Sequence, residues 1–203
     1  MSASDIDECD VCCSQGAWAA ETTTTMNHPD DTRFRHVFNR VERYIEERYG
    51  LPVVITDVPD PFTGDLDGAT ILVDHDLDAE ESLFILVHLF GHTVQWNVSP
   101  ADRELGLLEV KDPTDELLAS LERYEIDAAR YSLQLFHEAG VRDLDQWLAD
   151  FAACDIAYLL HFYRTGEKRP FRAFWTDGAP RLTPLAIPAF KPTKWVVRSG
   201  TVI

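Results

Sequence analysis

Two histidines stand four residues apart in the segment His88-Leu89-Phe90-Gly91-His92. In a helix this spacing places both imidazole rings on one face, one turn apart, where they can bind the same metal ion. Residues 79–96 are so apolar that they predict a central helix, in which each ring needs a polar partner. One metal ion would satisfy both rings, and the alternative is that each histidine is hydrogen-bonded within the core.

A carboxylate that could complete such a site follows on a second predicted helix. Glu125 lies about thirty residues downstream of the histidines. Two histidine nitrogens, one glutamate oxygen and an open position form the ligand set of catalytic zinc in many hydrolases. Glu122, one helical turn earlier, is the rival ligand, whereas Asp127 falls on a different face of the helix from Glu125. Spacing alone leaves Glu122 and Glu125 open.

These motifs resemble the ImmA/IrrE-like family of zincin metallopeptidases over roughly residues 31–140. The resemblance rests on two strands before the histidine helix, on the H-x-x-G-H core, and on a downstream E-x-[ED]-A-x-x-[FY]-[AS] pattern matched by Glu125, Asp127, Ala128, Tyr131 and Ser132. It implies a zincin-like (minimal gluzincin) α+β domain, with a small sheet packed on the active-site helix and further helices. It also implies that Zn²⁺ is bound by His88, His92 and Glu125.

One position departs from the family pattern, because Leu89 stands where the H-E-x-x-H signature has glutamate. That glutamate takes a proton from zinc-bound water and passes it to the leaving amine, which leucine cannot do. Losing such a base costs on the order of 10² to 10⁴ in rate. The chain therefore has no assigned catalytic residue. The candidates for a substitute base are His75 and Asp76 before the helix, and His161 on a later one.

Three hypotheses follow from these residues. The first is a zinc-binding, degenerate metallopeptidase that acts in binding or regulation, with a peptide or a regulatory protein as its partner. The second is an active zinc metallopeptidase with a substitute base, in which an extended peptide pairs with the predicted strand at 69–73. The third is a metal-free structural or interaction protein, in which both histidines bond to Glu125.

Composition narrows the classes of partner. The 203 residues carry a formal net charge of −17, which repels phosphate backbones, so we expect no nucleic-acid partner. No apolar run is long enough to span a bilayer, so no membrane partner is expected. Cys9, Cys12 and Cys13 form one cluster and Cys154 stands alone, which is not a disulfide framework. We expect a cytoplasmic protein and leave the role of the cysteine cluster open.

Apolar periodicity predicts a flexible tail at 1–30, the domain at 31–166, and a proline- and aromatic-rich extension at 167–203 that packs on the domain. We expect helices from Asp31 or Thr32 to Gly50, at 79–96, from Asp112-Pro113 to Gly140 and from Asp143 to Gly166, with strands at 53–55, 69–73 and 195–198. Residues 64–68 predict a turn. We expect His28, His36 and His137 at the surface and Cys154 in the core.

Overall fold

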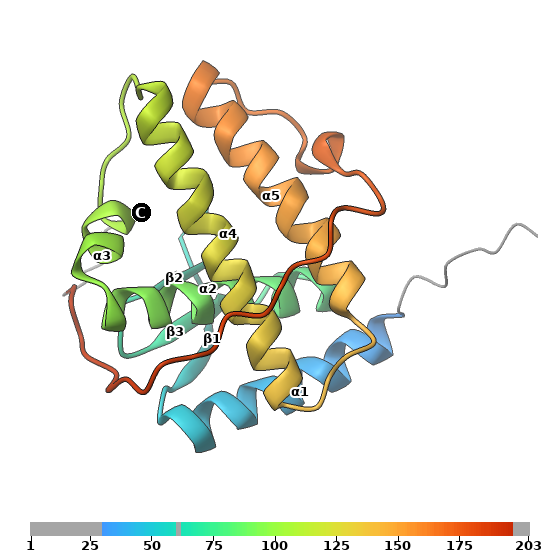
Figure 1. Cartoon of the computed structure of the whole chain (residues 1–203). Coiled ribbons are helices and arrows are strands. Elements are labelled where there is room, and N and C mark those ends of the chain that lie inside the picture. Colours follow the sequence, from blue (N-terminus) through green and yellow to red (C-terminus); the bar gives the residue numbers. More distant parts are fainter. Residues whose placement is uncertain (1–29, 60–61, 197–203) are drawn as a thin grey trace, which may run out of the picture.

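The computed structural model describes residues 30–59 and 62–196. Its elements follow in the order α1 (Asp31–Tyr49), β1 (Val53–Thr56), β2 (Gly64–Leu66), β3 (Ile71–Asp74), α2 (Ala79–Val98), α3 (Pro100–Gly106), α4 (Asp115–Glu138), α5 (Asp145–Thr165) and the 3-10 helix η1 (Phe171–Phe174) (Figure 1). Five α-helices and one small sheet confirm the predicted α+β class. The tail and the cysteines at 9, 12 and 13 lie outside the described residues.

The histidine helix α2 is central, as its sequence predicts. It packs against α1, α4 and the sheet, and the apolar side chains along it are almost all buried. Ile85 and Leu89 face β2, whereas Gly91 faces α4. Figure 1 shows α2 passing behind α4, while α4 and α5 run side by side in opposite directions. An apolar helix covered on several sides supplies the core on which the other elements pack.

The sheet has the strand order β1-β3-β2, with β1 parallel to β3 and β2 antiparallel to it. The predicted turn at 64–68 is therefore partly wrong, because Gly64 to Leu66 form the edge strand β2. Glycine and aspartate are typical of turns, so the residues of β2 do not indicate a strand by themselves. The segment is a strand because it pairs with β3. Since β3 has a partner on both sides, it offers no free edge, and the expected pairing of a peptide with 69–73 is wrong.

Three helix starts differ from the predicted ones. Helix α1 is capped by Asp30, whose carboxylate accepts a hydrogen bond from the Arg33 backbone. Helix α4 begins at Asp115 after the Thr114 cap, because Asp112 has a φ of 45° and cannot be helical. Helix α5 begins at Asp145 after the N-cap Leu144, and Asp143 lies before the helix and forms an ion pair with Arg33. The short helix α3, with proline in its first turn, is an addition to the prediction.

The chain after α5 crosses the outer face of α4 and continues towards α3 and β2 (Figure 1). Leu185 N–H donates to the carbonyl of Arg130 on α4, and the Arg130 side chain donates to the carbonyl of Thr183. Trp195 N–H donates to the carbonyl of Asp67, just after β2. The strand predicted at 195–198 is absent over residues 195–196, and the other two residues lie outside the described part of the chain.

The remaining predictions on single side chains have mixed outcomes. His36 is exposed and Cys154 is buried, as predicted, whereas His28 lies outside the described residues. The prediction for His137 is wrong, because its side chain is only 13% exposed and Nε2 lies 2.9 Å from an Asp145 carboxylate oxygen. His137 lies in the last turn of α4 and Asp145 begins α5, so this contact links the two helices.

Candidate metal centre

A close crossing of α2 and α4 positions the candidate ligands. At the crossing a Cβ added to Gly91 would lie 2.3 Å from the backbone oxygen of Ala128, so only glycine fits this contact. One turn along α4, the buried hydroxyl of Ser132 donates to the carbonyl of Val87 on α2, at 2.7 Å. The backbones therefore nearly touch, which leaves little freedom for side chains projecting into the angle between the helices.

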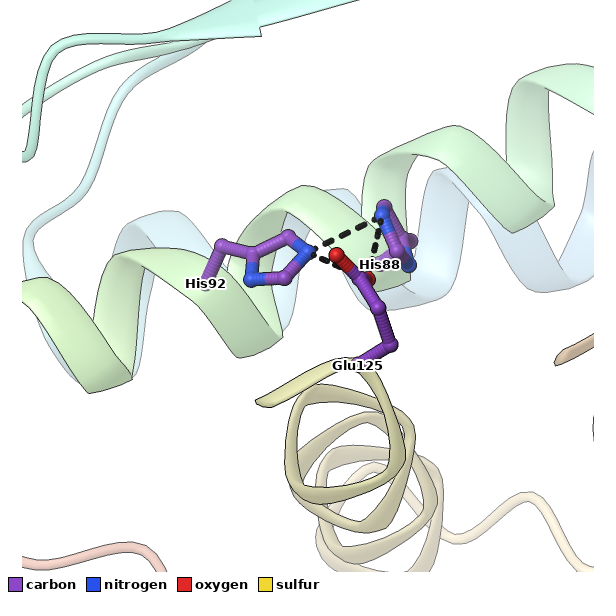
Figure 2. A group of neighbouring side chains, drawn as sticks. All are labelled: His88, His92 and Glu125. Carbon is purple, nitrogen blue, oxygen red and sulfur yellow. Dashed lines mark hydrogen bonds and ion pairs between the residues drawn. The ribbon is translucent and has the colours of Figure 1, made fainter. Parts of the chain in front are cut away.

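His88, His92 and Glu125 converge in that angle. Figure 2 shows both imidazoles projecting from α2 towards the Glu125 carboxylate, which rises from α4. His92 Nε2 lies 3.0 Å from His88 Nε2 and 3.1 Å from Glu125 Oε2, while His88 Nε2 lies 3.7 Å from the same oxygen. The side chains of His88, His92 and Glu125 are 16%, 8% and 10% exposed.

A chain of hydrogen bonds sets the orientation of His92. Its Nδ1 lies 2.8 Å from Gln95 Oε1, and Gln95 Nε2 donates to the Tyr124 carbonyl at 2.7 Å. Because the amide nitrogen of Gln95 is committed to that carbonyl, its oxygen must accept from His92 Nδ1–H. In the neutral ring the Nε2 lone pair then points at the other two side chains. The Tyr124 ring stacks on His92, with centroids 4.6 Å apart.

The three groups also perturb one another electrostatically. Burial, reinforced by His92, lowers the pKa of His88 to about 3. Burial lowers the pKa of His92 as well, but Glu125 and Gln95 outweigh it and the net pKa is raised. Burial raises the pKa of Glu125, yet the two histidines leave it below its usual value. At neutral pH the site therefore holds a neutral His88 beside a Glu125 carboxylate.

The geometry fits a metal ion better than a set of hydrogen bonds. Ligand atoms around a tetrahedral ion with bonds of about 2.0–2.1 Å lie about 3.3–3.4 Å apart. The observed separations of 3.0, 3.1 and 3.7 Å bracket that value. Without a metal ion, His92 Nε2 has one proton at most and cannot donate well to both His88 and Glu125. The group could therefore hold a metal ion, with the three atoms as ligands.

The other predicted candidates lie apart from this group. Glu122 is exposed on α4, whereas Glu125 lies in one group with the two histidines. The His161 ring packs at a tilt against Phe174, and its Nε2 lies 3.4 Å from the Thr165 hydroxyl on the same helix. His75 and Asp76 interact with each other in the exposed turn between β3 and α2. Within the described residues, none of the three candidate bases (His75, Asp76 and His161) forms a hydrogen bond, an ion pair or a ring contact with the triad.

A second group, Asp57, Asp74 and His75, also brings potential ligand atoms together. Asp74 accepts hydrogen bonds from the backbone N–H groups of Asp76 and Val58, both at 2.8 Å, and these bonds lower its pKa. The Asp74 carboxylate thus already has partners, and Asp57 and His75 are exposed. The hydrogen bonds of the turn after β3 explain why these three side chains lie together, and no metal ion is needed to explain their positions.

Sequence reasoning missed two side chains of α5 that interact with the triad. Burial and then Glu125 raise the pKa of Asp155 to about 7, although His92 lowers it. Burial, Glu125 and Asp155 raise the pKa of Tyr163 to about 12. A signal was available, because Asp155 is the only acidic residue in the apolar stretch 151–165. A lone carboxylate in such a helix suggests a specific role for the group.

Comparisons with protein-family models, with curated proteins and with solved structures found no match to this chain. The argument for function therefore depends on the residues of the site itself. Among the described helices, none combines the length and the apolar character needed to cross a membrane.

Proposed function

We propose that this protein binds zinc through His88, His92 and Glu125 and is a degenerate member of the zincin metallopeptidases. The observation that carries the proposal is the convergence of two imidazole nitrogens and one carboxylate oxygen within 4.8 Å of one another. Two nitrogen donors favour zinc over magnesium or calcium, which prefer oxygen ligands. The Gln95 hydrogen bond adds support, since metal-binding histidines commonly donate their other N–H to such an acceptor.

The side chain at position 89 argues for a binding or regulatory role rather than efficient peptide hydrolysis. Leu89 lies under β2, where a Cβ on Gly64 would come within 2.8 Å of Leu89 Cδ1. The position that holds the base in the zincin signature is thus filled by an apolar packing contact. A bound zinc ion would supply a positive charge able to polarise a carbonyl. We infer that the partner is a peptide or a regulatory protein.

Metal content of the full-length, untagged chain tests this proposal. We expect about one zinc per chain by mass spectrometry, and none in the His88→Ala/His92→Ala double variant. Glu125→Gln should also lose zinc. Glu122→Gln is the matched control, because it makes the same chemical change three residues earlier on α4, at an exposed side chain. A wild-type chain that takes up no zinc would support the metal-free hypothesis instead.

A second candidate function is zinc-dependent hydrolysis with a substitute base, and the observation that favours it is the Asp155 carboxylate facing the charges of the triad. Leu89→Glu separates the two candidates, because it restores the glutamate of the signature. Peptidase activity that appears only in this variant would contradict a substitute base. Activity already present in the wild-type chain, and abolished by a chelator, would contradict the degenerate form of the proposal.

A further inference from the structure

Helix α5 turns one face towards the metal-binding triad. Phe151 on α5 stacks on Phe84 of α2 with centroids 4.0 Å apart, and Phe84 stacks on His88 at 5.3 Å. Asp155 is one helical turn beyond Phe151 and Tyr163 is two turns beyond Asp155, so all three share this face. Since α5 also packs along α4, which carries Glu125, this face looks onto the angle where the ligands converge.

The electrostatics of Asp155 agree with this placement on the face of α5. Its carboxylate interacts with Glu125 of α4 and His92 of α2, and His92 in turn responds to Asp155. Tyr163 responds to both Glu125 and Asp155. Asp155 is thus a carboxylate that α5 contributes to the surroundings of the site, although it is distant in sequence from His88, His92 and Glu125.

The Asp155 carboxylate has no hydrogen bond or ion pair within the described part of the chain, although its residue is partly buried. A carboxylate in such surroundings requires a proton, a cation or a water molecule as its partner. Its raised pKa agrees with this, but a cation at the triad would lower that pKa again. The inference therefore stands on the placement of the group and on its lack of a protein partner.

Asp155 is too remote to be a ligand in the observed arrangement. The group whose ligand atoms all lie within 4.8 Å of one another contains the triad and excludes Asp155. One water molecule between the Asp155 carboxylate and the triad would bridge the distance that separates them. Leu89, the neighbour of His88 in sequence, is packed against β2.

We propose that Asp155 accepts a proton from a water molecule that a metal ion held by the triad would bind. In this step one O–H bond of the water breaks, the proton moves to an Asp155 Oδ atom, and the electron pair stays on the water oxygen. The inference rests on the proposed zinc site. It adds to that site a defined proton acceptor, supplied by α5.

Other groups near Asp155 must be distinguished from it in any pH titration. His92 faces it from α2 and Glu125 from α4, while Tyr163 and Cys154 interact with it on α5. The nearby cation of η1, Arg172, forms an ion pair with Glu80. Metal binding removes the histidines and Glu125 from the titration, because their lone pairs are then occupied.

The test uses the full chain loaded with Co²⁺, whose visible spectrum reports the groups around the ion. We expect two coupled inflections with pH in the wild-type chain, from Asp155 and the bound water, and only one in the near-isosteric Asp155→Asn variant. The controls are Glu122→Gln, which removes a charge on the exposed face of α4, and Tyr163→Phe, which removes the neighbouring hydroxyl. Both should retain two inflections.

Three outcomes would overturn the inference. Superposed pH profiles of the wild type and Asp155→Asn would show that Asp155 accepts no proton at the site. Loss of Co²⁺ binding in a folded Asp155→Asn variant would make Asp155 a ligand. A wild-type chain that binds neither Co²⁺ nor Zn²⁺ would overturn the proposed function itself, which distinguishes that failure from the first two.

Discussion

The role of Gln95 leads to the most quantitative prediction. Gln95 is 2% exposed and links His92 to α4, accepting from His92 Nδ1–H and donating to the carbonyl of Tyr124. Gln95→Leu removes both bonds while keeping a side chain of similar size. The His92 ring then loses the partner that holds its Nε2 lone pair towards His88 and Glu125.

The expected loss has two parts. Removing the hydrogen-bond partner of a metal-binding histidine lowers metal affinity by roughly 10- to 100-fold, or about 1.4–2.8 kcal/mol. Leaving His92 Nδ1–H without a partner also destabilises the metal-free fold, by about 1–3 kcal/mol for that buried group, while the Tyr124 carbonyl loses only a second bond because it lies within α4. Gln95→Glu keeps an acceptor for Nδ1–H but not the donor to Tyr124, so it should restore affinity more than stability.

Competition with a chromophoric chelator measures the zinc affinity, and urea unfolding of the metal-free chain measures stability. Gln134→Leu is the matched control, because Gln134 on α4 bonds only to Glu138 at the exposed end of that helix. It should leave zinc affinity unchanged. If Gln95→Leu binds zinc within about threefold of the wild type, the histidine does not depend on this bond and the reasoning is refuted.

Two further predictions concern the helix crossing and the effect of pH. Gly91→Ala should destabilise the fold by about 1–3 kcal/mol, since its Cβ would meet the Ala128 backbone oxygen at 2.3 Å; an unchanged urea midpoint would contradict this close approach. Zinc binding should weaken on acidification. The pKa of His92 is raised, so protons compete with zinc for this ring already above pH 6.5, whereas the lowered pKa of Glu125 keeps its carboxylate charged to below pH 4.5. In Asp155→Asn, which removes the other group that titrates near this pH, calorimetry at pH 6.5 should then detect proton release on zinc binding, and none would contradict the assignment to His92.

Much of the site could be predicted from features within single helices. The four-residue spacing of His88 and His92 places both rings on one face of any helix, whatever packs against it. The apolar stretch around them predicted a central helix, and α2 is central in the fold. The glycine of the motif was also visible, although its physical reason, the contact with Ala128, needs the second helix.

The third ligand could not be chosen from spacing alone. Glu122 and Glu125 are three residues apart on one helix, and either could approach a site on a neighbouring helix. The crossing of α2 and α4 decides between them, since it turns Glu125 inwards and leaves Glu122 exposed. Similarly, β2 pairs with β3 although its own residues favour a turn, because a strand's hydrogen bonds depend on its partner.

The amino-acid sequence by itself determined the helical periodicities, the pair of histidines on one face and the leucine at position 89 between them. Only the tertiary structure decided that Glu125 joins the histidines, that Leu89 packs against β2 and that α5 packs along α4 beside them. The physical reason is that periodicity within a helix follows from local backbone geometry. The meeting of three helices depends on how their side chains pack, to which residues throughout the core contribute.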